Sequence, residues 1–227
     1  VKLAARVAKL PGQIVQNKIA LVTGGSRGIG AAIATALARS GHRVAITYHS
    51  NSQAAREVVS AIETAGGRAE AFAWDGGEED SATKLWDQIG TRLGAPEILI
   101  HAASPPIAYE SVGELPSARL RQYFRVQVES ALDLVRQAIP TMEASGFGRV
   151  VFLGTSYLFG QPPAKMSAYI IAKSALWGMT RSLALELGPR KITVNMISPG
   201  MTVTDLTSDV PQRLKEVEAR RVPVRRL

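Results

Sequence analysis

A glycine-rich segment near the start of the chain constrains the fold more than any other feature. Residues 23–30 read TGGSRGIG, directly after the apolar run 19–22 and directly before the alanine-rich stretch 31–38. This order predicts a strand, a tight turn and the first turn of a helix. Unpaired backbone N–H groups and the positive end of the helix dipole then face the turn, an arrangement that binds the pyrophosphate of a nucleotide. The alternative is a strand–turn–helix unit that binds nothing.

Strands and helices alternate along the rest of the chain, which indicates an α/β fold: a doubly wound parallel sheet with helices on both faces. With 227 residues, of which 46% are hydrophobic, the chain can build a sizeable core and fits a single domain. The predicted strands are 19–22, 42–48, 68–74, 97–103, 150–153 and 192–197, and the predicted helices are 31–38, 53–65, 81–93, 118–144 and 166–187.

Tyr169 and Lys173 are four residues apart in the predicted helix 166–187. That spacing puts both side chains on one face of a helix. A neighbouring positive charge favours the phenolate and lowers a pKa that is ordinarily about 10. Such a phenol can exchange protons near neutral pH, which a general acid or base must do. On an unrelated helix the same spacing merely exposes a ring and a charge, so its meaning depends on the glycine-rich turn.

Together the two motifs resemble those of the short-chain dehydrogenase/reductase family. Within that family, the sequence is similar in general character to the 3-oxoacyl-[acyl-carrier-protein] reductases. The residues that carry the resemblance are Gly24-x-x-x-Gly28-x-Gly30, Tyr169-x-x-x-Lys173, Asp75 after the third strand, Asn195 in the sixth strand, Pro199-Gly200 and Thr204. The resemblance implies a Rossmann-like NAD(P)-binding domain over residues 18–227, after a basic N-terminal extension at 1–17. It also implies a homodimer or homotetramer. The family's last helix and seventh strand have no counterpart in this sequence.

For catalysis, the resemblance implies that Tyr169 protonates the oxygen of a substrate carbonyl. Lys173 would lower the pKa of the tyrosine and bind the nicotinamide ribose. A serine of the family polarises the carbonyl, and its usual spacing before the tyrosine selects Ser156. Counting forward from the fifth strand selects Thr155 instead, because this segment is one residue longer; we favour Ser156. Gln127 aligns with an asparagine that holds a proton-relay water in the family, and a purely structural glutamine is the alternative.

The choice of cofactor follows from charge at the end of the second predicted strand. NAD-selective sites place a carboxylate there to bind the ribose hydroxyls, and here Tyr48 is followed by His49-Ser50-Asn51. Arg27 adds a cation, unless it simply faces solvent, so we expect NADP(H). The predicted cofactor-binding residues are Gly24, Ser26, Arg27, Gly28, Ile29, Gly30, His49, Ser50, Asn51, Asp75, Ala102, Ala103, Tyr169, Lys173, Pro199, Gly200, Thr202 and Thr204.

The exit of the fourth predicted strand departs from the pattern that the resemblance implies. His101-Ala102-Ala103-Ser104 stands where the family pattern has Asn-Asn-Ala-Gly, and we interpret His101 as structural.

The predicted pocket walls are apolar and stiff at 105–107 and 161–164, and Met166, Met201 and Leu206 add adaptable apolar surface. Such walls suit an apolar ketone such as a 3-oxoacyl or polyketide chain. The alternatives are a sugar, a pteridine or another small carbonyl, or a non-catalytic NADP(H)-binding homologue.

Composition narrows the partners and the compartment. The net charge is +8, and no acidic residue precedes Glu57. This favours a cofactor phosphate or an acidic acyl carrier protein over nucleic acid, for which no motif is present. No apolar run reaches the ~20 residues that span a bilayer. The lack of cysteine and of histidines at ligand spacing argues against a metal site. Without cysteine the chain has no disulfides, so a reducing compartment such as the cytoplasm is expected. The basic start also fits a remnant of an organelle-targeting segment.

Overall fold

One parallel sheet organises the computed structural model, which describes residues 17–208 and 210–227. The sheet has six strands in the order β3-β2-β1-β4-β5-β6, and every neighbouring pair runs parallel. The strands are β1 (Ile19–Thr23), β2 (Arg43–Tyr48), β3 (Arg68–Ala73), β4 (Ile98–His101), β5 (Gly148–Leu153) and β6 (Ile192–Ile197). The order reverses between β1 and β4, which is the switch point where α/β proteins bind ligands.

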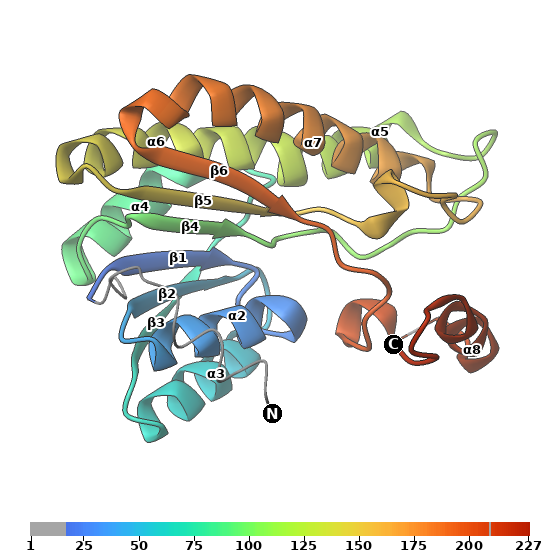
Figure 1. The fold of residues 1–227 in the computed structure, drawn as a ribbon, viewed down its shortest axis with the longest axis horizontal. Coiled ribbons are helices and arrows are strands. Elements are labelled where there is room, and N and C mark those ends of the chain that lie inside the picture. Colours follow the sequence, from blue (N-terminus) through green and yellow to red (C-terminus); the bar gives the residue numbers. More distant parts are fainter. Residues whose placement is uncertain (1–16, 209) are drawn as a thin grey trace.

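Helices cover both faces of this sheet (Figure 1). Helices α2 and α3 lie on one face, and α4, α6 and α7 lie on the other. The predicted doubly wound α/β fold is therefore confirmed. The helices are α2 (Gly28–Arg39), α3 (Ser52–Thr64), α4 (Ser81–Arg92), α5 (Ser117–Phe124), α6 (Ser130–Ser145), α7 (Ser167–Leu187) and α8 (Gln212–Arg221), with 3₁₀ turns η2 (Ser156–Leu158), η3 (Gly188–Arg190) and η4 (Asp205–Thr207).

Two hydrophobic cores hold the layers together, one on each side of the sheet. All five residues of β1 are buried because helices cover it from both faces. Leu21 packs into the core under α4, α6 and α7, whereas its neighbours Ala20 and Val22 pack into the core under α2 and α3. This alternation is the two-residue period of a strand, and it sets the ends of β1 and β4 side by side at the switch point.

The predicted helix 118–144 is interrupted. It consists of α5 and α6, joined by the π-helical turn η1 (Arg125–Glu129). The carbonyl of Val126 in this turn accepts a hydrogen bond from the Ser130 hydroxyl at 2.7 Å and lies 3.2 Å from Nε2 of His101. The wider turn thus lies where polar groups of α6 and β4 meet the same carbonyl.

Towards the end of the chain, residues 204–208 and 210–227 contain η4 and α8. The basic extension predicted at 1–17 lies outside the described residues except for Asn17, so the boundary at residue 18 stays a prediction. Within residues 17–208 and 210–227, no helix combines the length and the apolar character that a membrane span requires.

Candidate active site

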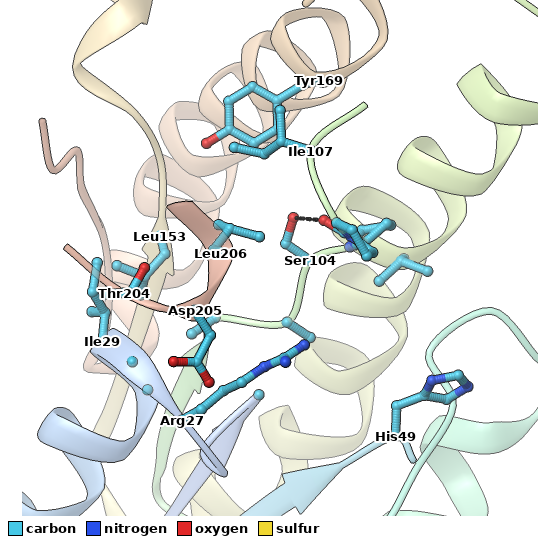
Figure 2. Close-up of a pocket in the computed structure, with 18 of the residues that line it drawn as sticks. Arg27, Ile29, His49, Ser104, Ile107, Leu153, Tyr169, Thr204, Asp205 and Leu206 are labelled. Carbon is cyan, nitrogen blue, oxygen red and sulfur yellow. Dashed lines mark hydrogen bonds between the residues drawn. The ribbon is translucent and has the colours of Figure 1, made fainter. Parts of the chain in front are cut away.

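A cavity of about 640 Å³ opens beyond the carboxyl ends of the central strands, at the switch point between β1 and β4. Figure 2 shows its walls, with Arg27 and Thr204 near the glycine loop and Tyr169 at the far end. Every residue predicted to bind the cofactor lines this one cavity, although the segments come from opposite ends of the chain. Ser156 and Gln127 do not line it. The fold therefore brings the two sequence motifs to a single site.

The glycine loop can adopt its shape only because its glycines lack side chains. Gly24 has φ +64°, and a Cβ there would lie 3.1 Å from the backbone of Ala103. A Cβ on Gly30 would overlap the carbonyl oxygen of Gly24. No side chain caps the N-terminus of α2, and its first turn has no acidic residue. The loop therefore presents backbone N–H groups and the positive end of the helix dipole, which suits a pyrophosphate.

Thr23 anchors the exit of β4 beside this loop. Its hydroxyl oxygen accepts hydrogen bonds from the amides of Ala102 and Ala103, each at 3.1 Å, and lies 3.0 Å from Nδ1 of His101. Burial, followed by the charge of Lys173, lowers the pKa of His101 to about 3, so the imidazole is neutral. Because the carbonyl of Val126 can only accept, Nε2 carries the proton, and the Thr23 hydroxyl donates to Nδ1. His101 is thus structural, as expected.

Tyr169 and Lys173 are both buried on α7, with 8% and 4% of their surface exposed. The Lys173 ammonium donates a 2.6 Å hydrogen bond to the carbonyl of Leu153 at the end of β5, and Nζ lies 5.7 Å from the centre of the Tyr169 ring. This places the pair at one end of the cavity, with the ammonium held by the sheet.

The expectation of an acidified phenol is wrong for this structure. Burial raises the pKa of Tyr169 to about 12, and the Thr155 hydroxyl, hydrogen-bonded to it, offsets only part of that rise. Burial also lowers the pKa of Lys173 to about 7. The ammonium is itself desolvated, so it carries only part of its charge at neutral pH. Desolvation is therefore the largest cause of both pKa shifts.

The comparisons with known proteins agree with this geometry. The family model described as short chain dehydrogenase matches residues 18–215. The chain belongs to the short-chain dehydrogenase family. The expected family is thus confirmed, and its members bind nicotinamide cofactors.

Three relatives illustrate how closely this short-chain dehydrogenase resembles characterised proteins. Versicolorin reductase of Emericella nidulans is 33% identical over 192 residues, 85% of this chain and 72% of that protein. The 3-oxoacyl-[acyl-carrier-protein] reductase of Pseudomonas aeruginosa is 32% identical over 216 residues, 94% of this chain and 85% of that protein. The crystal structure of a short chain dehydrogenase from Burkholderia cenocepacia in complex with NADP matches with a TM-score of 0.83 and 35% identity, covering 94% of this chain and 86% of that chain.

Thr155, rather than Ser156, faces the cavity of this short-chain dehydrogenase. Thr155 is 5% exposed, has an extended backbone with φ −152° and ψ 145°, and hydrogen-bonds Tyr169. Ser156 starts the turn η2, where its amide donates to the carbonyl of Pro199 at 2.9 Å. The geometry therefore reverses our preference for Ser156. The residue in the cavity wall is the one selected by counting forward from the fifth strand.

Gln127 lies beside the cavity and not in its wall. It is fully buried in η1, and its amide donates a 2.8 Å hydrogen bond to the hydroxyl of Ser104. Its carbonyl oxygen is buried without a hydrogen-bond partner among the described residues. The observed contact supports the loop after β4. The relay role expected for Gln127 stays a prediction.

At the opposite end, the tips of β2 and β3 form the side of the cavity predicted to hold the adenosine. His49 Nε2 lies 3.3 Å from the carboxylate of Asp75, which joins the two strand ends. Asn51 uses its side-chain oxygen to cap α3, accepting from the amide of Ala54 at 2.9 Å. Figure 2 shows the Arg27 guanidinium extended into the cavity. A cation and an imidazole therefore occupy the end where NAD-selective enzymes place a carboxylate.

Proposed function

We propose that this short-chain dehydrogenase is an NADPH-dependent reductase that converts a ketone to an alcohol. One observation carries the proposal. The hydroxyls of Tyr169 and Thr155 and the ammonium of Lys173 meet at one end of a cavity whose other end is an uncapped glycine loop. This is the arrangement in which a proton donor lies beside the reactive ring of a bound dinucleotide.

The bound nicotinamide cofactor would supply the hydride, and the residues of the chain manage the proton. Because its pKa is raised to about 12, Tyr169 is protonated at neutral pH and starts as a donor, as reduction of a ketone requires. Thr155 hydrogen-bonds the phenol and can donate to the substrate oxygen. Lys173, with a pKa of about 7, can return a proton to the phenolate, and its bond to Leu153 keeps it in place.

Charge at the adenosine end supports NADPH over NADH. The end of β2 offers His49, Ser50 and Asn51 and no carboxylate, and Arg27 extends into the same cavity. The acids that line the cavity are Asp75, whose carboxylate is paired with His49, Glu78 and Asp205, and none of them belongs to the end of β2. The NADP complex of the Burkholderia relative is consistent with this choice.

The walls at the catalytic end support an apolar ketone. Apolar side chains line the cavity here, so a long acyl or polyketide chain would make apolar contacts and leave water. These wall residues are Pro105, Pro106, Ile107, Met166 and Leu206. Burial raises the pKa of Tyr157, a cavity residue, and among the smaller causes the charge of Glu218 raises it and that of Arg221 lowers it, so α8 lies close to this end. The two relatives named above are a versicolorin reductase and a 3-oxoacyl-[acyl-carrier-protein] reductase. We therefore favour a 3-oxoacyl or polyketide-type substrate, and the +8 charge suits an acidic acyl carrier protein.

The test measures NADPH oxidation by wild type and Tyr169→Phe against four ketone classes: a 3-oxoacyl thioester, an aromatic polyketide ketone, a sugar and a pteridine. Wild type should reduce the 3-oxoacyl or polyketide ketone. Tyr169→Phe should lose ~10²- to 10⁴-fold in kcat and keep its affinity for NADPH, because only the proton donor is removed. Equal rates for both proteins, or NADPH binding with no turnover of any ketone, would instead identify a non-catalytic NADP(H)-binding protein.

A further inference from the structure

The connection between β4 and α5 forms one wall of the catalytic end and has no helix or strand of its own over residues 102–116. Residues 102–107 and Tyr109 line the cavity. A connection of this length has many conformations, so some contact must hold the wall in one of them if the substrate is to be positioned accurately.

Tyr123 on α5 supplies such a contact. It has no exposed surface, and its hydroxyl donates to the carbonyl of Pro106 at 2.5 Å and accepts from the amide of Ala108 at 2.9 Å. The two bonds bracket Ile107, whose side chain faces the cavity near Tyr169 (Figure 2). One phenol thus fixes the backbone on both sides of a residue in the substrate wall.

The ring of Tyr123 also contacts the proton donor. It packs edge to face against the ring of Tyr169, with centroids 6.2 Å apart and an interplanar angle of 79°. Both rings belong to a small buried cluster with Val128, Met166 and Ala172, and Ile107 packs against that cluster. The same side chain therefore sets the distance between the substrate wall and the catalytic phenol.

We propose that Tyr123 is a positioning residue that holds the 105–108 wall against the Tyr169 ring and so determines how large ketones are bound. This inference rests on the proposed function for its catalytic consequences and on geometry alone for the anchor itself. The hydroxyl of Tyr123 binds no atom that would react. Its removal should therefore affect the fit of the substrate while proton donation and the cofactor pocket stay intact.

The experiment compares Tyr123→Phe with Thr180→Val. Each removes one buried hydroxyl, but Thr180 bonds only the carbonyl of Leu176 within α7, away from the cavity. In Tyr123→Phe, hydrogen exchange of the amides of Ile107, Ala108 and Tyr109 should accelerate by about tenfold, since Ala108 loses its acceptor. KM for a bulky ketone should rise on the order of tenfold, while KM for a small ketone, kcat and NADPH affinity stay near the wild-type values. Thr180→Val should change none of these quantities.

Unchanged exchange at residues 107–109 in Tyr123→Phe would overturn the proposal, as would faster exchange without a selective rise in KM for the bulky ketone. A parallel loss of melting temperature and kcat in both variants would reduce Tyr123 to a stability role. If wild type reduces no ketone, the proposed function fails. The exchange measurement, which needs no substrate, then still decides whether Tyr123 anchors the wall.

Discussion

Lys173 places an ammonium group in the buried core, and replacing this residue should reveal how much its burial lowers the free energy of unfolding. The side chain is 4% exposed, and among residues 17–208 and 210–227 its ammonium has one hydrogen-bond acceptor, the carbonyl of Leu153. Lys173→Met keeps a side chain of similar length without the charge. We expect the difference in the free energy of unfolding between wild type and this variant to depend on pH.

The magnitude follows from the two pKa values of the lysine. Its pKa falls from the ordinary 10.5 to about 7 in the folded protein because the ammonium is desolvated. Between these values the unfolded chain binds a proton that the folded protein does not, so the free energy of unfolding rises with pH. Integrated from pH 7 to pH 9, the rise is about 2 kcal/mol. Tyr169, whose pKa is raised to about 12, stays protonated in both states over this range and adds nothing.

The assay is urea denaturation at pH 7, 8 and 9 of wild type, Lys173→Met and Lys84→Met, which alters an exposed lysine on α4. Wild type should gain about 2 kcal/mol relative to Lys173→Met from pH 7 to pH 9, and no such trend should separate wild type from Lys84→Met. The unsatisfied Leu153 carbonyl shifts the Lys173→Met curve equally at every pH, so it cannot imitate the trend. A difference that is constant with pH would show that the ammonium remains well solvated, and our account of the pair would fail.

Two further predictions test the site residues. Thr155→Val should lower kcat about 100-fold or more by removing the hydroxyl that faces Tyr169, whereas Ser156→Ala should stay within about twofold of wild type; steady-state kinetics with the reverse ranking would restore Ser156. Arg27→Gln should weaken NADPH binding by ~10- to 100-fold and leave NADH binding nearly unchanged, with the exposed Arg39→Gln as the control. Equal losses for both cofactors in fluorescence titrations would mean that Arg27 does not meet the 2′-phosphate.

The strongest features of the fold were readable in the sequence because they are local. The glycine turn before an alanine-rich helix predicted the β1–α2 unit, and the i, i+4 spacing predicted that Tyr169 and Lys173 share a face of α7. The sequence predicted one continuous helix over 118–144, and η1 interrupts it. The π-helical turn arises where His101, from a distant strand, meets the carbonyl of Val126.

The contacts of Thr23 and Tyr123 were not predicted from the sequence, for a related reason. Thr23 is the first residue of the glycine-rich segment, and its position at the end of the first strand was the sequence signal for a role at the site. Its hydrogen-bond partners at 101–103 lie at the end of β4 and directly after it, far away in the chain. Tyr123 lies in a helix of ordinary composition, and its partners Pro106 and Ala108 follow β4 in the chain. Side-chain contacts between elements depend on how those elements pack, which periodicity does not encode.

The sequence by itself determined the alternation of strands and helices, the glycine turn and the shared helix face of Tyr169 and Lys173, because each depends on neighbours a few positions away. The tertiary structure decided which hydroxyl faces the cavity, which way the two pKa values move and which side chain bonds the backbone of Pro106 and Ala108. These properties depend on burial and on contacts between distant segments, and burial is set only when the layers close around the sheet. The ionisation of Tyr169 and Lys173 is thus a property of the folded core, although their identities and spacing are written in the chain.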